Sequence, residues 1–128
     1  MSGAPILVVD DNPANLKLIR YILDHRGYQV HTAINAEEAL GILATCRPAV
    51  ILMDLQLPGI DGFELTRRIK ADPTTRDIPV LAVTGYAMKG DAERARAAGC
   101  DDFITKPIDI QELPELVARY AQGRLTRG

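Results

Sequence analysis

The sequence has no marked excess of charge of either sign. Lys and Arg together number 15 and Asp and Glu together number 17, which gives a formal net charge of −2 over 128 residues. Proteins that bind nucleic acid concentrate positive charge against its phosphates. This balance offers no such surface, so nucleic acid is not an expected partner.

Cysteine is scarce as well. The chain has two cysteines, Cys46 and Cys100, and no C-x-x-C pair. The two histidines, His25 and His31, match no metal-binding spacing. The pattern therefore favours two free thiols in a reducing compartment over a disulfide or a zinc site.

A signal peptide and any apolar segment long enough to span a bilayer are also missing. We therefore expect a cytoplasmic protein with no membrane partner. With 47% hydrophobic and 25% charged residues, the composition is that of an ordinary globular protein. A chain of this length forms one domain and can bury about two-thirds of its unfolded surface.

What the sequence does contain is a set of five short apolar runs at regular intervals. They begin at Pro5, Tyr28, Ala49, Pro79 and Asp102. A segment with helical periodicity follows each run. The pattern predicts a strand followed by a helix, repeated five times.

The helical segments carry their own start and stop signals. For the first, Asn12 or Asp11 is the predicted N-cap, Pro13 is the first residue and Gly27 ends the helix. Capping boxes, in which a Glu stands three positions after the N-cap, open the second, third and fifth helices: Asn35–Glu38, Asp61–Glu64 and Asp109–Glu112.

The last two helices have less regular starts. The fourth is predicted to begin near Gly90-Asp91 and to end at Gly99. In the fifth, Pro114 lies too deep for the free first turn of a helix that follows Asp109 directly. Either that first turn is tight or the helix starts late.

The composition of the runs orders the sheet. The first, third and fourth are apolar throughout, as central parallel strands are, whereas the second alternates and the fifth is short. Parallel strands with right-handed crossovers then give an α/β fold: a five-stranded sheet of order 2-1-3-4-5 with five helices on both faces. Such sheets bind ligands at the carboxyl ends of the strands where the winding reverses, here between strands one and three.

Polar residues gather at that rim. Asp10 and Asp11 end the first strand, Asp54 ends the third, Thr84 ends the fourth, and Lys106 follows the fifth. Crowded carboxylates repel one another and suit a hard divalent cation such as Mg²⁺. Lysine and threonine can bind a phosphoryl group, and a carboxylate can attack phosphorus to form an aspartyl phosphate.

Four motifs carry a resemblance to a known family. They are VVDDN at Val8 to Asn12, LMDLQLPGIDG at Leu52 to Gly62, VTGYA at Val83 to Ala87, and FITKPI at Phe103 to Ile108. Together, in this order and at strand ends, they resemble the receiver domain of two-component response regulators over residues 5–121. The chain looks most like single-domain regulators of the cell-division type. The resemblance implies a flavodoxin-like, CheY-like fold.

The resemblance also implies a role for each residue of the rim. Asp54 is expected to be the phospho-acceptor, taking its phosphoryl group from a partner histidine kinase or histidine phosphotransfer protein. Asp10, Asp11, Asp54 and the backbone carbonyl of Gln56 are expected to hold Mg²⁺, Asp11 directly and Asp10 largely through water. Lys106 is expected to pair with Asp54 and then with the phosphate.

The remaining roles concern a switch. Thr84 is expected to hydrogen-bond a phosphate oxygen, and Phe103 matches the family's switch aromatic, which turns inward as Thr84 moves toward the phosphate. The Lys106-Pro107 peptide bond is expected to be cis. Simpler readings stay open: Asp11 as a helix cap alone, Thr84 as a β-branched strand residue, and Phe103 as ordinary core.

The sequence departs from the family pattern beside the site. Gly85 stands where the family usually has Ala, which leaves more room and more backbone freedom near the phosphate. Phe103 lacks the phenol that some relatives carry, so burying its ring leaves no polar group unpaired. Gln56 and Tyr86 occupy positions that tune dephosphorylation in the family.

The family also implies interaction surfaces. A downstream protein target is expected on the face formed by the fourth helix, the fifth strand and the fifth helix. Kinase docking is expected near Asn15 and Leu16 and at the loop Lys106 to Asp109, although Leu16 can equally belong to the edge of the core. We expect a monomer or a weak dimer.

The expected organisation is one receiver domain over residues 1–128, with a core at 5–121 and a short tail at 122–128. A receiver domain cut from a hybrid histidine kinase or a larger regulator is the alternative. The expected activity is that of a switch rather than an enzyme, apart from intrinsic self-dephosphorylation. Two other classes compete: a Mg²⁺-dependent phosphohydrolase, for which Gln56 stands where a general acid is needed, and a receiver that binds partners without phosphate.

Overall fold

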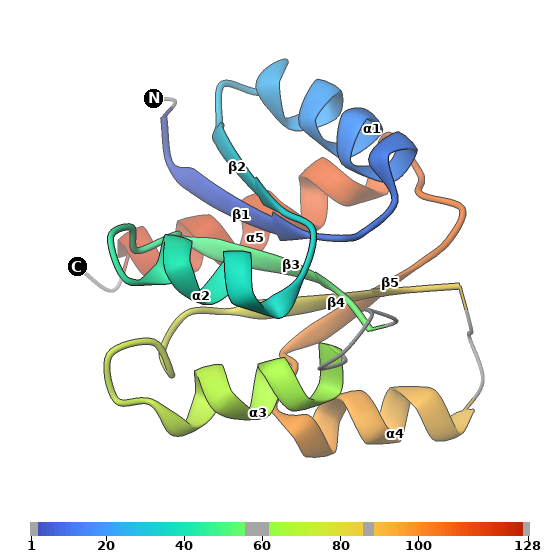
Figure 1. The fold of residues 1–128 in the computed structure, drawn as a ribbon. Helices are drawn as coiled ribbons and strands as arrows, with labels where there is room; N and C mark the ends of the chain where they lie inside the picture. Colours follow the sequence, from blue (N-terminus) through green and yellow to red (C-terminus); the bar gives the residue numbers. More distant parts are fainter. Residues whose placement is uncertain (1–2, 56–61, 86–88, 127–128) are drawn as a thin grey trace.

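The computed structural model describes residues 3–55, 62–85 and 89–126. Strands and helices alternate along the chain (Figure 1). The strands are β1 (Pro5–Val9), β2 (Gln29–Ala33), β3 (Val50–Asp54), β4 (Val80–Thr84) and β5 (Asp102–Thr105). The helices are α1 (Pro13–Asp24), α2 (Ala36–Leu43), α3 (Gly62–Ala71), α4 (Lys89–Ala98) and α5 (Glu112–Thr126). Each strand begins at the first or second residue of a predicted apolar run.

The strands form one parallel sheet of order β2-β1-β3-β4-β5, as the sequence predicts. The register brings the carboxyl ends of the central strands level with one another. Val9 lies opposite Met53, and Asp54 lies opposite Val83. The residues that follow or end these strands therefore share one rim of the sheet.

Helices cover both faces of the sheet (Figure 1). On one face, apolar side chains of α1 and α5 pack with alternate residues of the strands, among them Ile19, Leu23 and Val117. On the other face, α2, α3 and α4 supply residues such as Ala39 and Leu65. All five residues of β3 and of β4 are buried, whereas β2 is mostly half-buried, which confirms the predicted central and edge positions.

The start of α1 confirms one of the two predicted caps. The Asn12 side chain accepts hydrogen bonds from the backbone N–H of Ala14 and Asn15, at 2.8 and 3.3 Å. Asn12 is therefore the N-cap, with Pro13 as the first helical residue. Gly27 follows the helix with φ +85°, a left-handed conformation that glycine adopts readily.

The capping box of α2 is formed with a shift of one residue. Asn35 Oδ1 accepts from the Glu38 N–H at 2.8 Å, as predicted. Glu38 Oε1 accepts from the N–H of Ile34, one residue before the N-cap, at 3.0 Å. The predicted cap of α3, Asp61, lies outside the described residues.

The late-start alternative is correct for α5. Asp109 Oδ1 accepts from the N–H groups of Gln111 and Glu112, at 2.7 and 3.0 Å, and the helix begins at Glu112. Pro114 is then the third helical residue, in the turn whose N–H groups have no helical partner. These hydrogen bonds hold the pKa of the Asp109 carboxyl below its usual value.

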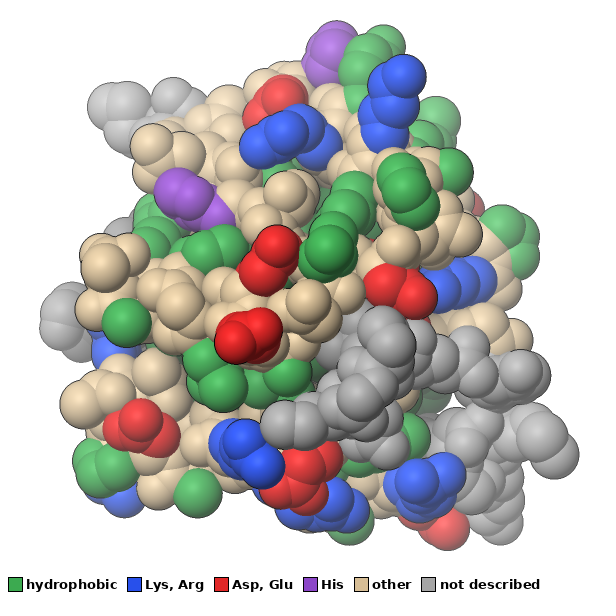
Figure 2. All heavy atoms as spheres, in the orientation of Figure 1, with side chains coloured by type: hydrophobic (Ala, Val, Ile, Leu, Met, Phe, Trp, Pro, Cys, Tyr) green, Lys and Arg blue, Asp and Glu red, His purple; other side chains and the backbone are tan. Residues whose placement is uncertain are grey.

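The face that Figure 2 shows and the described helices bear on the expected lack of nucleic-acid and membrane partners. Figure 2 shows acidic and basic side chains interspersed with hydrophobic and other groups over the face in view. Within the described ranges, every helix falls short of the length and apolarity that crossing a membrane requires.

Candidate functional site

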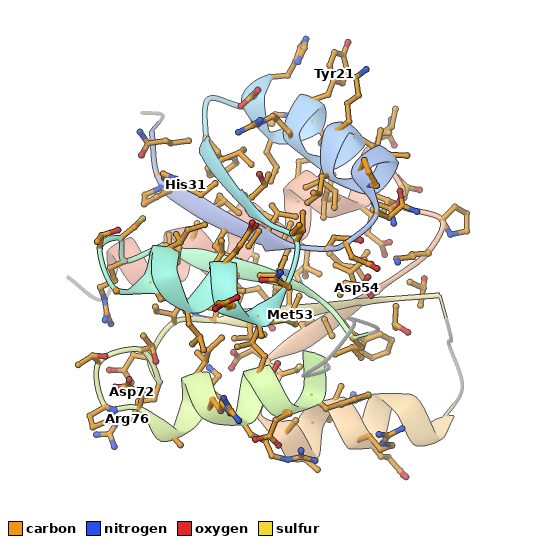
Figure 3. The ribbon with its side chains drawn as sticks, in the orientation of Figure 1. Tyr21, His31, Met53, Asp54, Asp72 and Arg76 are labelled. Carbon is orange, nitrogen blue, oxygen red and sulfur yellow. The ribbon has the colours of Figure 1, made fainter. Side chains whose placement is uncertain are left out.

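Three carboxylates meet at the carboxyl-end rim of the sheet. Asp10, Asp11 and Asp54 each offer an oxygen within 4.8 Å of the others. Asp10 and Asp54 are buried, at 1% and 3% exposure, while Asp11 is exposed. Figure 3 shows Asp54 at the end of β3, at the rim where β1 also ends. Parallel pairing of β1 with β3 thus brings together acids that lie far apart in the sequence.

The two oxygens of the Asp10 carboxylate differ in their hydrogen bonding among the described residues. Its Oδ1 accepts from the Asn12 N–H at 2.8 Å, which ties the acid to the start of α1. Its Oδ2 is buried and has no hydrogen-bond partner among the described residues. A buried carboxylate oxygen without a partner is costly unless a cation or water binds it. Together with two further carboxylates, this oxygen fits a hard, oxygen-binding ion such as Mg²⁺.

A lysine supplies the positive charge of the site. Lys106 Nζ lies 3.7 Å from Asp54 Oδ1, a separation of an ion pair rather than a direct hydrogen bond. The Lys106 backbone N–H donates to the carbonyl of Thr84 at 2.7 Å, which fixes the residue just past β5. The following Lys106-Pro107 bond is cis, as the family resemblance implies.

The residues expected to form the switch lie on the two neighbouring strands β4 and β5. Thr84 is buried at the end of β4. Phe103 is half-buried on β5, opposite Ala82, and packs against the core cluster on the side of α2, α3 and α4. Gly85 leaves room beside the lysine, because among the described residues a Cβ built there would have only Lys106 Cδ near it, at 4.0 Å.

Not every predicted site residue can be located. Gln56, whose carbonyl is the expected fourth metal ligand, and Tyr86 lie outside the described residues. The structure brings together Asp10, Asp11 and Asp54, with Lys106 beside Asp54.

Sequence reasoning missed the closeness of one glycine to this site. With Asp61 as the predicted N-cap, Gly62 is the expected first residue of the third helix, and α3 does begin there. In addition, the Gly62 N–H donates to the carbonyl of Leu55 at 3.3 Å, directly after the expected phospho-acceptor. The only signal in the sequence was a glycine at a helix start, which does not reveal such an approach.

The arrangement has a definite chemical capacity. A cluster of carboxylates can bind a divalent cation, the neighbouring ammonium group can neutralise a phosphoryl oxygen, and the buried acid can act as a nucleophile toward phosphorus. Transfer of a phosphoryl group depends mainly on such positioning and charge neutralisation.

Comparison with known sequences agrees with this chemistry. The sequence matches the family described as response regulator receiver domain over residues 6–118. It is 44% identical to the polar-differentiation response regulator DivK of Brucella anthropi over 115 residues, which cover 90% of this chain and 94% of that protein. The DivK protein of Brucella ovis is 42% identical over the same shares of the two chains.

Solved structures agree in fold. The receiver domain of the sensor histidine kinase PA1611 from Pseudomonas aeruginosa, with a magnesium ion coordinated in its active-site cleft, superposes with a TM-score of 0.87 at 36% identity. The match covers 94% of this chain and 99% of that one. A CheY-like receiver domain protein from Methanospirillum hungatei gives a TM-score of 0.90 at 30% identity, covering 99% and 100% of the two chains.

Proposed function

Because the chain belongs to the response regulator receiver domains of two-component signal transduction, we propose that Asp54 is its phospho-acceptor. Receiver domains are in general phospho-acceptor switches that interact with histidine kinases and downstream targets. The observation that carries the assignment to Asp54 is its position. Its carboxylate lies within 4.8 Å of those of Asp10 and Asp11, and 3.7 Å from Lys106 Nζ.

The proposed reaction is transfer from a phosphohistidine of a histidine kinase or histidine phosphotransfer protein. A carboxylate oxygen of Asp54 forms a bond to phosphorus as the bond between phosphorus and the histidine nitrogen breaks. The electron pair of that bond stays on the imidazole, which then takes a proton. Lys106 offsets the negative charge of the new aspartyl phosphate, and the Thr84 hydroxyl donates to one of its oxygens.

The acidic pocket of receiver domains binds Mg²⁺, and we propose that Asp10, Asp11 and Asp54 hold it here. The bound ion supplies charge stabilisation for the phosphoryl oxygens. The buried Oδ2 of Asp10, which has no partner in the part of the chain that the structure describes, and the mutual repulsion of the three acids support this proposal. By resemblance to the family, the backbone carbonyl of Gln56 is a further ligand.

We propose Thr84 and Phe103 as the switch that reads the phosphate. Movement of Thr84 toward the phosphate opens space on the neighbouring strand, into which the half-buried ring of Phe103 turns. The turn of Phe103 then changes the surface formed by α4, β5 and α5, where a downstream protein binds. Kinase docking at the start of α1 and the loop after Lys106, a cytoplasmic location and a monomer or weak dimer complete the proposal.

The proposed organisation is a stand-alone receiver domain over residues 1–128. The 94% of the Brucella anthropi DivK protein that the match covers supports it. The alternative is a receiver domain of a hybrid histidine kinase. It is supported by the 36% identity to the receiver domain of the Pseudomonas aeruginosa sensor histidine kinase.

The deciding experiment is treatment with acetyl phosphate with and without Mg²⁺, followed by intact mass measurement. We expect one phosphoryl group per chain, only when Mg²⁺ is present, and none in Asp54→Asn. Pull-down of partners from labelled and unlabelled protein then reports the output surface.

Two outcomes would contradict the proposal. Sustained release of phosphate far beyond one equivalent per chain, lost in Asp54→Asn, would indicate a phosphohydrolase rather than a switch with slow self-dephosphorylation. Absence of any label with Mg²⁺ present would indicate a receiver that binds partners without phosphate.

A further inference from the structure

The first residue of α3 lies against the backbone of the expected phospho-acceptor. A Cβ built on Gly62 would lie 2.3 Å from the carbonyl oxygen of Asp54 and 2.6 Å from the Cα of Leu55. Both distances are far below van der Waals contact, and both atoms belong to the backbone, so no side-chain rotation can relieve them. No residue other than glycine fits here without a shift of α3 or of the end of β3.

Gly41 behaves differently, although it too lies within a helix. A Cβ built on Gly41, in α2, would meet no atom of another described segment within 4 Å. An alanine at position 41 is therefore expected to be accommodated, and helices favour alanine over glycine. The close approach at Gly62 is thus not a general property of helical glycines in this chain.

The start of α3 is anchored to the end of β3 and to the core. The Gly62 N–H donates to Leu55 O at 3.3 Å, and the Thr66 hydroxyl donates to Gly62 O at 2.7 Å. Further along α3, Leu65 and Ile69 are buried in the core. The Gly62 N–H and the buried side chains therefore tie α3 to the rest of the protein, while the Thr66 hydrogen bond lies within α3 and stiffens its first turn.

The end of β3 is the other side of the contact. Asp54 lies opposite Val83 in the ladder with β4, and its carboxylate must meet those of Asp10 and Asp11, which follow β1. A displacement of the Asp54 backbone therefore changes the distances within the acid cluster. Misplacement of a reacting group by about 1 Å can cost about a hundredfold in rate.

We propose that Gly62 is a positioning residue for phosphorylation. Its missing side chain lets α3 begin directly against the carbonyl of Asp54. This contact sets where the Asp54 carboxylate stands relative to the other two acids. The proposal rests on the proposed function of Asp54, and Gly62 itself touches no reactant.

The test compares Gly62→Ala with Gly41→Ala, two glycine-to-alanine changes within helices. Magnesium affinity is measured by calorimetric titration. The labelling rate is measured at saturating Mg²⁺ and acetyl phosphate, well below the unfolding temperature of each variant. We expect Gly62→Ala to weaken Mg²⁺ binding and to lower the saturated labelling rate, each by about tenfold or more. Gly41→Ala is expected to keep both within about twofold of the wild type.

The saturated rate separates positioning from a loss of folded protein. A Gly62→Ala protein that is less stable but labels and binds Mg²⁺ like the wild type overturns the proposal. If the variant is too unstable alone, it is made in the Gly41→Ala background. Failure to fold there as well would assign the close approach to folding rather than to phosphorylation, and would also overturn it.

Failure of the proposed function itself looks different. In that case the wild-type protein takes no label, whatever residue stands at position 62.

Discussion

The two rims of the sheet treat their charges in opposite ways. Figure 3 shows Asp54 at one rim, while Asp72 and Arg76 lie at the other, in the segment after α3. At this amino-end rim, Lys70 Nζ donates to Asp101 Oδ2 at 3.0 Å and to the carbonyls of Ile78 and Arg76 at 2.8 and 3.2 Å. One ammonium group thereby joins the end of α3, the start of β4 and the start of β5.

Two acids of the amino-end rim, Asp101 and Asp72, accept hydrogen bonds from nearby donors. Asp101 Oδ2 also accepts from the Val80 N–H at 2.8 Å, and Asp72 Oδ1 accepts from the N–H and the hydroxyl of Thr74, at 2.8 and 2.7 Å. These bonds lower the pKa of the exposed Asp72 carboxyl. Such an arrangement serves stability, because each charge is satisfied within the protein.

The carboxyl-end rim instead gathers like charges. Asp10, Asp11 and Asp54 lie within reach of one ion, a buried Asp10 oxygen has no partner among the described residues, and Lys106 stays 3.7 Å from Asp54. Proteins tolerate such local cost at sites that bind or react. The comparison teaches that the crowding of like charges, with one buried oxygen of Asp10 left without a partner among the described residues, distinguishes the rim of the proposed site.

The largest difference between the two rims is expected when one acid is removed from each. Asp54→Asn is expected to lower labelling by acetyl phosphate by about two orders of magnitude or more, since a nucleophile is lost. Asp72→Asn, the matched change at the amino-end rim, should label at the wild-type rate. Intact mass measurement over time gives both rates. Equal labelling of the two variants would show that Asp54 is not the acceptor.

Magnesium should stabilise only through the carboxyl-end rim. An ion that binds the folded state alone adds about 2.7 kcal/mol to the free energy of unfolding at a hundred times its dissociation constant. Asp10→Asn should lose more than half of this increment. Urea unfolding at fixed ionic strength, with and without Mg²⁺, measures it. An undiminished increment in Asp10→Asn would place the ion elsewhere.

The amino-end rim should matter for stability and not for phosphorylation. Lys70→Met removes a donor that serves three acceptors but is partly exposed, so we expect a loss of about 1–2 kcal/mol in the free energy of unfolding. Arg67→Met is the control, because its pair with Glu64 is exposed and contributes little. Labelling rates of both folded variants should stay within about twofold of the wild type. A slowed Lys70→Met would couple the two rims.

The smallest expected effect is a pH dependence at the amino end of β5. The Tyr120 hydroxyl donates to Asp102 Oδ2 at 3.1 Å and to Asp101 O at 3.2 Å. Burial raises the Tyr120 pKa, and the hydrogen bond to Asp102 raises it further. The folded state therefore holds this proton more tightly than the unfolded state does.

The sign of the effect follows from that difference. The stabilisation is complete below about pH 10, the ordinary pKa of tyrosine, and is lost as pH rises through the raised value. Tyr120→Phe should remove this part of the alkaline decline in stability, measured by urea unfolding between about pH 9 and pH 11. Tyr21→Phe, on the exposed surface of α1, should keep the decline. Parallel curves for wild type and Tyr120→Phe would contradict the prediction.

The sequence predicts the fold well because its signals are local. Each apolar run marks a strand, and the difference between uniform and alternating runs separates central strands from edges. Convergence of Asp10, Asp11, Asp54 and Lys106 follows from the same topology, since parallel strands share their carboxyl ends. The expected roles of these residues stay predictions until labelling tests them.

What could not be predicted depends on how distant segments meet. The three acceptors of Lys70 come from two segments, the one before β4 and the one before β5, and no local pattern in the sequence predicts them. The distance from Gly62 to Asp54 depends on how closely α3 packs against the sheet. Likewise, Glu38 accepts a hydrogen bond from the N–H of Ile34 rather than from that of Asn35. This depends on the local backbone path, which a capping pattern does not specify.

The carboxyl-end rim also ties the chemistry to the completion of the sheet. Its residues are spread from position 10 to position 106, and the last of them follows the last strand of the sheet. While Lys106 is still inside the ribosome, the emerged part of a nascent chain holds the three acids of the site but not its lysine. Only chains in which all five strands have joined the sheet should therefore accept a phosphoryl group. Pulse labelling during refolding should measure when the sheet is completed.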